Sequence, residues 1–457
     1  MLESLELSGV PTELFVTPPT PDQWANRHGM QAFGIAGMSR AMTVAQMNDE
    51  LPDVLSSIRT HQPRFAHYKI CSTFDSSPRV GSIGHAIEIG QTVFQNRVTP
   101  LLVAAPHLGR YCAFGNLFAR SGSSGEISRL DRHAAMADHP ITPMREADLR
   151  RHLAEQTKLP IVLIDVLALD RGAEAALAAI ERAKDGSIVL FDSLRDEHLA
   201  TAGRVMARLQ EGENQPLFVV GSSGIELALS SQRTSACHAA AASTDLPTCC
   251  SEHGEATTPI LVLSGSCSPV TRRQIVTAAT KGFLELPLDV RRVQASADPA
   301  AELNRMATLV ASAYETGRSI VIHTNDEQTQ GRMTEQATIN VGAFLARLLG
   351  NVLQMTPVKR IVVAGGDTSG SIARAIGIDS LKLVRPLETG APLCAARSAD
   401  ERVDGVEFVF KGGQIGNDDF FSVAAAAKSS LRCTSQPNGR PAAVPNAFAS
   451  QNPLTSA

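Results

Sequence analysis

The stretch IVVAGGDTSGSIARAIGI, from Ile361 to Ile378, decides how the second half of this chain folds. It begins as an apolar run typical of a buried strand and breaks at the Gly-Gly-Asp-Thr of residues 365–368. Apolar residues at helical spacing follow, and Gly377 is placed to end the helix. Glycines at such a junction let an anion approach the backbone, and the next helix turns its free N–H groups and positive dipole end toward it. The junction therefore predicts a phosphate cradle.

Two further strand ends in the same half are rich in small residues. They are the Ser-Gly-Ser-Cys-Ser of residues 264–268 and the Lys-Gly-Gly of residues 411–413, with Gly416 nearby. Ligands of open parallel sheets bind beyond the carboxyl ends of the strands, so we expect the three loops to face one ligand. The predicted nucleotide-binding residues are Ser264, Ser266, Gly365, Gly366, Asp367, Thr368, Gly413 and Gly416.

Asp367 and Lys411 are the predicted catalytic residues. The carboxylate can hold Mg²⁺ or orient the attacking hydroxyl, and the ammonium can neutralise phosphate charge. Simpler interpretations exist, since one glycine-rich turn is more often only a tight turn, Lys411 could be solvated and Asp367 could be a helix N-cap. Three such turns in one domain favour a nucleotide site, although no Walker or dinucleotide pattern is present. The missing dinucleotide spacing argues against a dehydrogenase.

The first half of the chain places a different set of side chains at its strand ends. HYKICSTFDSSPRVGSIGHAIEIG, residues 67–90, sets a lysine, hydroxyls and an acid between a strand and a helix. Residues 34–42 and 105–116 add cations at two other strand ends. Hydroxyls suit a polyol and cations suit a carboxylate, so the set favours a small hydroxylated anion over turn chemistry and solvated surface cations. The predicted substrate-binding residues are Ser39, Arg40, Lys69, Ser72, Thr73, Asp75, Gly81, Ser82 and Arg110.

The composition limits the partners that we expect. A formal charge of −4 over 457 residues, one tryptophan and three tyrosines give no basic surface or aromatic platform for nucleic acid. No apolar run of about 18 residues or basic leader is visible, so no membrane partner is expected. The eight cysteines follow no disulfide framework, which favours a reduced, cytoplasmic setting. The oligomeric state leaves no pattern in the sequence.

Apolar runs alternate with helical periods along most of the chain. This pattern predicts an α/β fold of two domains, each a mostly parallel sheet covered by helices, with a cleft between them. We expect a substrate domain at 1–230, a linker at 231–258, a nucleotide-binding domain at 259–428 and a disordered tail at 429–457. Cysteines and histidines in the linker lack paired zinc spacing, so a metal site is the less favoured interpretation of Cys237, His238, Cys249, Cys250 and His253.

Two local features are predicted near the N-terminus. A short helix should run from Leu2 to Leu7, before a strand at residues 13–16. Thr43 and Gln46 should form a capping box at the start of a longer helix. A doubly wound domain normally opens with a strand that feeds its first helix, whereas no such strand precedes Leu2.

Several of these stretches resemble the four-carbon acid sugar kinase family. LSGSCSPVTRRQI, VVAGGDTSGSIARAIGI and FKGGQIGNDDFF resemble its nucleotide-binding domain, and YKICSTFDSSPRVGSIG resembles its sugar-acid domain. The resemblance covers roughly residues 1–425 and implies ATP- and Mg²⁺-dependent phosphorylation of a terminal hydroxyl on a 3-oxo-tetronate, a tetronate or a related branched acid. It implies ATP contacts for Ser266, Gly365, Gly366, Asp367, Thr368 and Gly413, and sugar-acid contacts for Arg40, Lys69, Ser72 and the 81–84 turn.

The sequence departs from the family pattern at its front. Family members open with a strand and an Asp-Asp-x-Thr-Gly-like loop, which would precede Leu2 here. We expect either a start upstream of Met1 or a shortened, weakened enzyme, and an in-frame segment upstream of Met1 in the DNA would decide between them. The alternative function is a catalytically impaired or repurposed relative that binds nucleotide or a protein partner.

Overall fold

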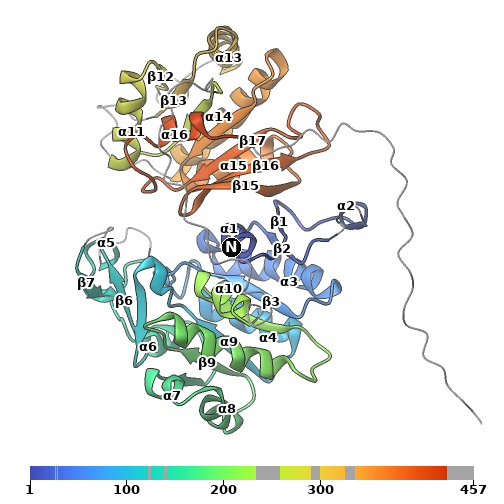
Figure 1. The fold of residues 1–457 in the computed structure, drawn as a ribbon, viewed down its shortest axis with the longest axis vertical. Coiled ribbons are helices and arrows are strands. Elements are labelled where there is room, and N and C mark those ends of the chain that lie inside the picture. The colour runs from blue at the N-terminus through green and yellow to red at the C-terminus, as the bar shows by residue number, and fades with distance from the viewer. Residues whose placement is uncertain are drawn as a thin grey trace, which may run out of the picture.

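Two sheets organise the chain, one in each lobe of the computed structural model (Figure 1). The structure describes residues 1–25, 27, 29–121, 125–137, 142–232, 258–289, 299–324 and 335–429. The five linker residues considered as zinc ligands and most of the expected linker and tail lie outside these ranges. Within them, no helix combines the length and apolar character that a membrane crossing needs.

The lobe built from the first half holds a five-stranded sheet that is parallel throughout. Its order is β3 (Phe65–Lys69), β10 (Leu217–Gly221), β4 (Val98–Leu102), β9 (Ser187–Phe191) and β8 (Ile161–Ile164). Every residue of β4, β9 and β10 is buried, as expected for strands covered on both faces. The covering helices are α3 (Val44–Thr60), α4 (Ile83–Phe94), α6 (Leu149–Ala154), α7 (Val166–Asp170), α8 (Ala173–Glu181), α9 (Asp196–Gln210) and α10 (Ser223–Ser230).

The other lobe is built on a nine-stranded mixed sheet. Its parallel part contains β12 (Leu284–Pro287), β13 (Ile320–His323), β11 (Leu261–Ser264), β14 (Arg360–Ala364) and β17 (Glu407–Lys411). Two antiparallel strands, β16 (Ala391–Arg397) and β15 (Ser380–Glu388), extend the sheet. Its helices are α11 (Pro269–Thr280), α13 (Pro299–Glu315), α14 (Glu335–Met355), α15 (Gly366–Ala375) and α16 (Phe420–Ala426).

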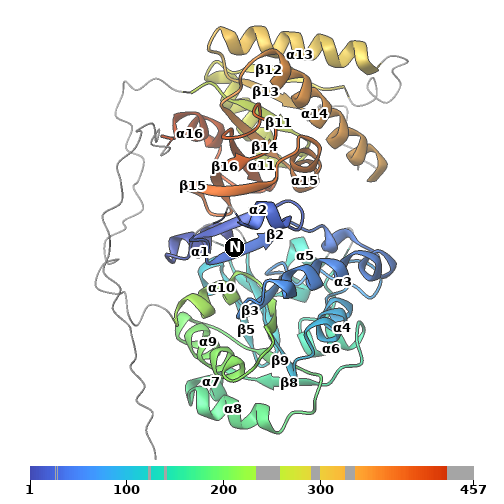
Figure 2. The ribbon, with the colours of Figure 1, turned by 90° about the vertical axis from the view of Figure 1, so that its right-hand side faces the viewer.

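The nine-stranded sheet takes its last two strands from the N-terminal segment of the chain. Strand β1 (Thr12–Phe15) pairs antiparallel with β15, and β2 (Ala32–Ile35) pairs parallel with β1. Figure 2 shows this dark-blue pair between the two lobes, with α2 (Pro21–Ala25) at its end. Glu13 is buried in the joint, where it accepts hydrogen bonds from Arg27 and from the Ser380 hydroxyl. This shared sheet was not predicted from the sequence.

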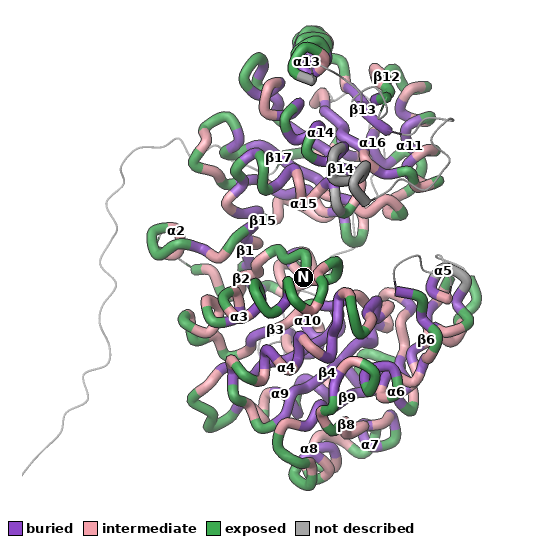
Figure 3. Tube along the Cα trace, turned by 180° about the vertical axis from the view of Figure 1, so that it is seen from behind, coloured by how far each residue is buried: buried purple, intermediate pink, exposed green. Residues whose placement is uncertain are grey.

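Buried residues concentrate along the strands of both sheets (Figure 3), and hydrophobic clusters join these strands to the helices that cover them. In the nine-stranded sheet, Leu261 and Leu263 pack with α13, α14 and α15, whereas Val262 packs with α11 and α16. Successive strand residues point to opposite faces, so an unbroken apolar run fills two cores at once. The prediction of a two-domain α/β fold with mostly parallel sheets is confirmed.

Several local predictions are also confirmed. Helix α1 runs from Leu2 to Leu7, and Thr43 and Gln46 form the capping box of α3. Helix α15 ends at Ala375, and Gly377 follows with a φ of 74°. Not predicted was a three-stranded antiparallel sheet of β5 (Arg110–Ala113), β6 (Asn116–Arg120) and β7 (Ile127–Arg129), followed by the short helix α5 (Ala134–Ala137).

Candidate active site

The three glycine-rich loops begin at the carboxyl ends of three neighbouring strands of the nine-stranded sheet. The last residues of β11, β14 and β17 lie side by side, with Ser264 opposite Ala364 and Ala364 opposite Lys411. Gly265 N–H donates to Ala364 O at 3.1 Å, and Gly365 N–H donates to Lys411 O at 2.9 Å. Parallel pairing therefore brings the predicted cradle residues together.

Two of the cradle glycines sit against neighbouring loops so closely that no side chain fits. A Cβ on Gly265 would lie 2.2 Å from the Thr368 hydroxyl oxygen, and a Cβ on Gly413 would lie 2.3 Å from the Ser266 hydroxyl oxygen. Gly365 has a φ of 120°, which residues with a Cβ rarely adopt. The glycines therefore let the hydroxyls of Thr368 and Ser266 lie against neighbouring loops, and the backbone N–H groups of such loops can bind phosphate.

Hydroxyl groups form hydrogen bonds between the loops at these strand ends. The Ser266 hydroxyl accepts from Ser268 N–H at 3.2 Å, and the hydroxyls of Ser268 and Thr271 donate to Gly413 O at 2.7 and 2.8 Å. Within the described residues, the buried Ser264 hydroxyl has no hydrogen-bond partner. An unpaired buried hydroxyl at a strand end is a donor available to a ligand.

Gly416 and Lys411 have different surroundings from those that we expected. Gly416 has a φ of 87°, and a Cβ there would lie 2.6 Å from the Phe420 ring, so this glycine lets α16 pack. Lys411 is buried rather than solvated, with its Nζ 3.4 Å from the Thr271 hydroxyl and 5.7 Å from the centre of the Phe420 ring. Burial lowers the pKa of Lys411 to about 8. The Lys411 ammonium is therefore buried under the cradle, and Thr271, whose hydroxyl contacts both the ammonium and Gly413 O, connects the two.

The backbone of Asp367 occupies the second position of α15, and Gly365 is the N-cap. The alternative that Asp367 is only an N-cap is therefore wrong. No group of three or more His, Cys, Asp or Glu residues in the described part of the chain is arranged to hold a metal ion. Mg²⁺ is commonly held by one or two carboxylates together with phosphate oxygens, so the cradle does not need a protein cage for it.

The substrate-side loop that follows β3 is held in a strained form. Arg40 binds the Asp75 carboxylate at 2.5 Å, and the Thr73 hydroxyl donates to the same carboxylate at 2.6 Å. Between them, Phe74 is fully buried with a φ of 56°, a costly backbone state for a bulky residue. A Cβ on Gly81 would lie 2.5 Å from Arg40 O. These contacts fix Arg40, whose side chain remains 62% exposed and can still present donors to an anion.

Other predicted substrate residues have partners within the protein. Ser39 accepts from the Tyr68 hydroxyl at 2.8 Å, and Ser82 caps α4 by accepting from His85 N–H. Ser72 is partly exposed in the loop after β3. Arg110 donates to three backbone carbonyls of the β5–β6 hairpin, those of Leu108, Gly109 and Arg120. Ser82 and Arg110 therefore contribute to the local structure, and their part in substrate binding, like that of Ser72, stays a prediction.

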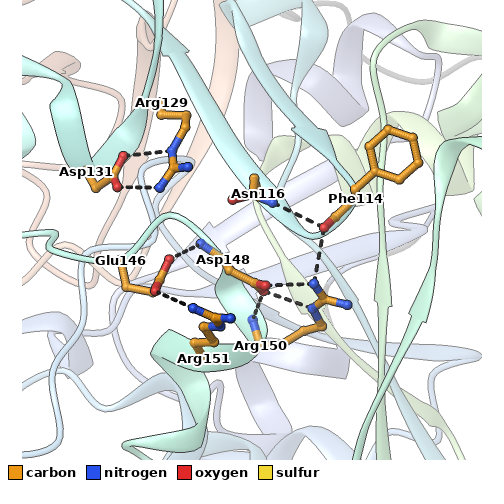
Figure 4. Close-up of polar contacts among 8 residues, drawn as sticks. All are labelled: Phe114, Asn116, Arg129, Asp131, Glu146, Asp148, Arg150 and Arg151. Atoms are coloured by element: carbon orange, nitrogen blue, oxygen red, sulfur yellow. Dashed lines mark hydrogen bonds and ion pairs between the residues drawn. The ribbon is translucent and has the colours of Figure 1, made fainter.

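The β5–β6 hairpin stands over the carboxyl ends of β4 and β9 and is braced by α6 (Figure 4). Asp148 caps α6 and binds the Arg150 guanidinium at 2.7 and 2.9 Å. Arg150 and Asn116 both donate to Phe114 O at the hairpin tip, at 3.3 and 3.2 Å. Glu146 accepts from Asp148 N–H at 2.9 Å. The hairpin is thus a fixed wall beside the substrate-side strand ends.

The loop that carries Arg40 contacts helix α15 of the other lobe. Met38 precedes the Ser39–Ala41 turn on the substrate side, and its Sδ contacts the Arg374 guanidinium of α15. The same Sδ lies 3.8 Å from the position of a Cβ on Gly370, in the second turn of α15. The helix whose N-terminus forms part of the cradle therefore borders the loop that carries Arg40.

Comparisons with known proteins agree with this geometry. Residues 1–229 match the model of a sugar-binding N-terminal domain, and residues 261–421 match that of a nucleotide-binding C-terminal domain. A 3-oxo-isoapionate kinase from Paraburkholderia graminis is 42% identical over 436 residues, which cover 92% of this chain and 90% of that protein. The chain belongs to the four-carbon acid sugar kinase family.

The family resemblance seen in the sequence is thereby confirmed. A 3-oxo-tetronate kinase from Methylobacterium radiotolerans is 31% identical over 369 residues, covering 78% of this chain and 80% of that protein. A crystal structure from Salmonella typhimurium LT2, of a protein described as a tRNA synthase, superposes with a TM-score of 0.73 at 24% identity. It covers 93% of this chain and 95% of its own, and shows the shared fold alone.

Three residues near the candidate site were not predicted from the sequence of this kinase-family chain. Thr271 lies in the first turn of α11 and links the Ser266 loop, Gly413 and Lys411. Glu226 lies in the first turn of α10, directly after β10, and its Oε1 is 3.6 Å from Nδ1 of His67, the central residue of β3. The one available signal was Glu226, the single charged residue of an otherwise small and apolar helix.

One cavity lined by described residues lies away from the cradle. It has a volume of about 690 Å³ and is lined in part by Leu353, Pro357, Lys359, Arg402 and Glu407. These residues lie at the amino ends of β14 and β17, opposite the cradle edge. Ligands of parallel sheets bind at carboxyl ends, so the cavity carries no part of the candidate site.

Proposed function

We propose that this chain is an ATP-dependent kinase that phosphorylates a terminal hydroxyl of a small sugar acid. The observation that carries the proposal is the position of Met38, whose Sδ lies 3.8 Å from a Cβ on Gly370 and so sets the Arg40 loop beside the helix that starts in the phosphate cradle. A phosphoryl donor held at the cradle and an acceptor held at Arg40 would be neighbours. Proximity of that kind supplies much of the rate in phosphoryl transfer.

The residues at the cradle suit a nucleotide's phosphates. Backbone N–H groups at residues 266, 366–368 and 413 would hold the phosphate oxygens, with added donors from the hydroxyls of Ser264 and Ser266. Asp367, at the start of α15, would hold Mg²⁺. Mg-ATP supplies the phosphoryl group and neutralises part of its charge. The protein's own contribution is positioning, together with fixed dipoles at the N-termini of α11 and α15.

The substrate side suits an acid with several hydroxyls. Arg40, fixed by Asp75, would bind the carboxylate, and Lys69 adds a second positive group at the end of β3. The Paraburkholderia relative is named for 3-oxo-isoapionate and the Methylobacterium relative for 3-oxo-tetronate. We rank a branched acid such as 3-oxo-isoapionate first, because its kinase is the more similar of the two.

The test is a coupled ADP-release assay on a panel of 3-oxo-isoapionate, 3-oxo-tetronate and tetronates. We expect saturable ADP release that depends on the acid, with the highest kcat/KM for the branched acid. Asp367→Ala should lower kcat by orders of magnitude, whereas Asp49→Ala, which removes an exposed acid in the second turn of α3, should leave it unchanged. Binding of ATP without acid-dependent ADP release would instead support a non-catalytic relative.

A further inference from the structure

Glu226 is a buried acid that the proposed phosphoryl-transfer chemistry does not use. It lies in the first turn of α10, directly after β10, and is only 3% exposed. Among the described residues, neither of its carboxylate oxygens has a hydrogen-bond partner. Buried polar atoms in native proteins are nearly always paired, so a carboxylate with no donor requires an explanation.

Two basic side chains and the Met1 ammonium lie around Glu226 without donating hydrogen bonds to it. Lys69 Nζ is 3.9 Å and His67 Nδ1 is 3.6 Å from Oε1, both longer than a hydrogen bond. His67 Nε2 lies 3.0 Å from Gly221 O and donates there. Burial lowers the pKa of His67 to about 4, so the ring is neutral and its Nδ1 has no proton to give. The carboxylate is therefore left with acceptor capacity that the protein does not fill.

The position of Glu226 is that of a ligand group. Lys69 ends β3, Glu226 follows β10, and these strands are paired with Lys69 opposite Gly221. Burial lowers the pKa of His107, which follows β4, and the charge of Glu226 opposes that shift. The carboxylate thus shares its sheet edge with the substrate-side residues. Lys69, whose side chain is 38% exposed, connects it to the surface.

The chemistry of a carboxylate selects its partner. An ionised carboxylate only accepts hydrogen bonds and repels phosphate and carboxylate groups. Hydroxyls are the donors that a sugar acid offers, and O–H···O⁻ bonds are short and strong. A structural ion pair does not explain the arrangement, because a buried pair needs good geometry and additional hydrogen bonds.

We propose that Glu226 is a specificity-determining residue that accepts hydrogen bonds from hydroxyls of the sugar-acid acceptor. The inference rests on the proposed function and deepens it: Arg40 binds the carboxylate of the acid, and Glu226 accepts hydrogen bonds from its hydroxyls. Acceptors that lack the hydroxyl read by Glu226 are discriminated against, because they leave the buried carboxylate unpaired.

The test compares Glu226→Gln and Glu226→Met with the wild type, using the acceptor of highest turnover and its singly deoxygenated analogues. Losing a hydrogen bond to a charged group lowers kcat/KM for the full acceptor by about 10- to 100-fold, through KM for the acid. KM for ATP stays unchanged. For the deoxy analogue that lacks the hydroxyl bound by Glu226, kcat/KM is almost the same in the wild type and in Glu226→Gln. Glu197→Gln, an exposed first-turn acid of the neighbouring helix α9, serves as the matched control.

A second measurement is independent of turnover. Without acceptor, Glu226→Met melts at the wild-type temperature or about 2–4 °C above it, because an unsatisfied buried charge is removed. Melting several degrees lower would identify a structural ion pair and overturn the proposal. So would equal kcat/KM for both enzymes on every acceptor, or a fall in kcat with KM unchanged. A wild type that phosphorylates no acid refutes the proposed function, and the melting comparison still decides the role of Glu226.

Discussion

Replacing Gly265 by alanine tests the cradle directly. The added Cβ would lie 2.2 Å from the Thr368 hydroxyl oxygen, more than 1 Å inside an ordinary contact, which begins at about 3.4 Å. A rotation of Thr368 that exchanges its hydroxyl and methyl groups leaves the clash, because the methyl group would then occupy the place of the hydroxyl. The loop after β11 and the start of α15 must therefore move apart.

The cost follows from overpacking a tight contact. Extra methyl groups forced into packed sites typically cost about 1–3 kcal/mol. If the strain is relieved by opening the cradle, it appears in nucleotide binding, and 1–3 kcal/mol corresponds to roughly 5- to 150-fold in affinity. We expect KM for ATP to rise by that factor while KM for the sugar acid stays within about twofold.

The assay is ADP release with ATP varied at saturating acid, together with thermal unfolding of both proteins. Gly350→Ala is the control, because Gly350 lies inside α14 and a Cβ there meets nothing within 4 Å. That variant should be as active as the wild type and as stable or slightly more so. A normal KM for ATP in folded Gly265→Ala would refute the claim that these loops grip the nucleotide.

Three further predictions follow from buried charges. The folded-state pKa of Lys411, about 8, lies below the ordinary value of 10.5, so the unfolded chain holds the extra proton between these pH values and stability rises with pH there. In Lys411→Met, the free energy of unfolding measured with urea should no longer rise with pH in this range, and at pH 7 it should exceed that of the wild type by about 1–3 kcal/mol. A variant less stable than the wild type would contradict the burial argument. Glu13→Ala leaves Arg27 without its ion-pair partner in the joint between the lobes and should lower the free energy of unfolding by about 3–5 kcal/mol, as measured with urea. An unaffected unfolding midpoint would show that the joint is not stabilising. Asp75→Asn releases Arg40 and should raise KM for the sugar acid by about 10- to 100-fold without changing KM for ATP; equal effects on both substrates would refute the assignment.

The sequence predicted the features that depend on neighbouring residues. The strand ending at Ala364, the helix that follows it and its closing Gly377 are local patterns, and they were placed correctly. The gathering of Gly265, Gly365 and Gly413 at one edge also followed, because parallel strands put their carboxyl ends together.

Long-range pairing was outside the reach of those patterns. Nothing in the segment at β1 specifies that Phe15 pairs with Ser380, since register between distant strands is set by tertiary packing. The side on which Lys411 lies depends on the pleat of β17, which alternates residue by residue. Glu226 looked like one polar position on a short helix, and only its burial beside Lys69 and His67 marks it out.

The most direct measurement of the central claim follows the phosphoryl group itself. The protein is incubated with the sugar acid and with ATP whose terminal phosphate carries heavy oxygen at all non-bridging positions, and the products are weighed by mass spectrometry. If cradle and acceptor loop meet as the structure indicates, the intact labelled phosphoryl group is found on the acid. Label that appears only in inorganic phosphate, or stays on ATP, would contradict the account.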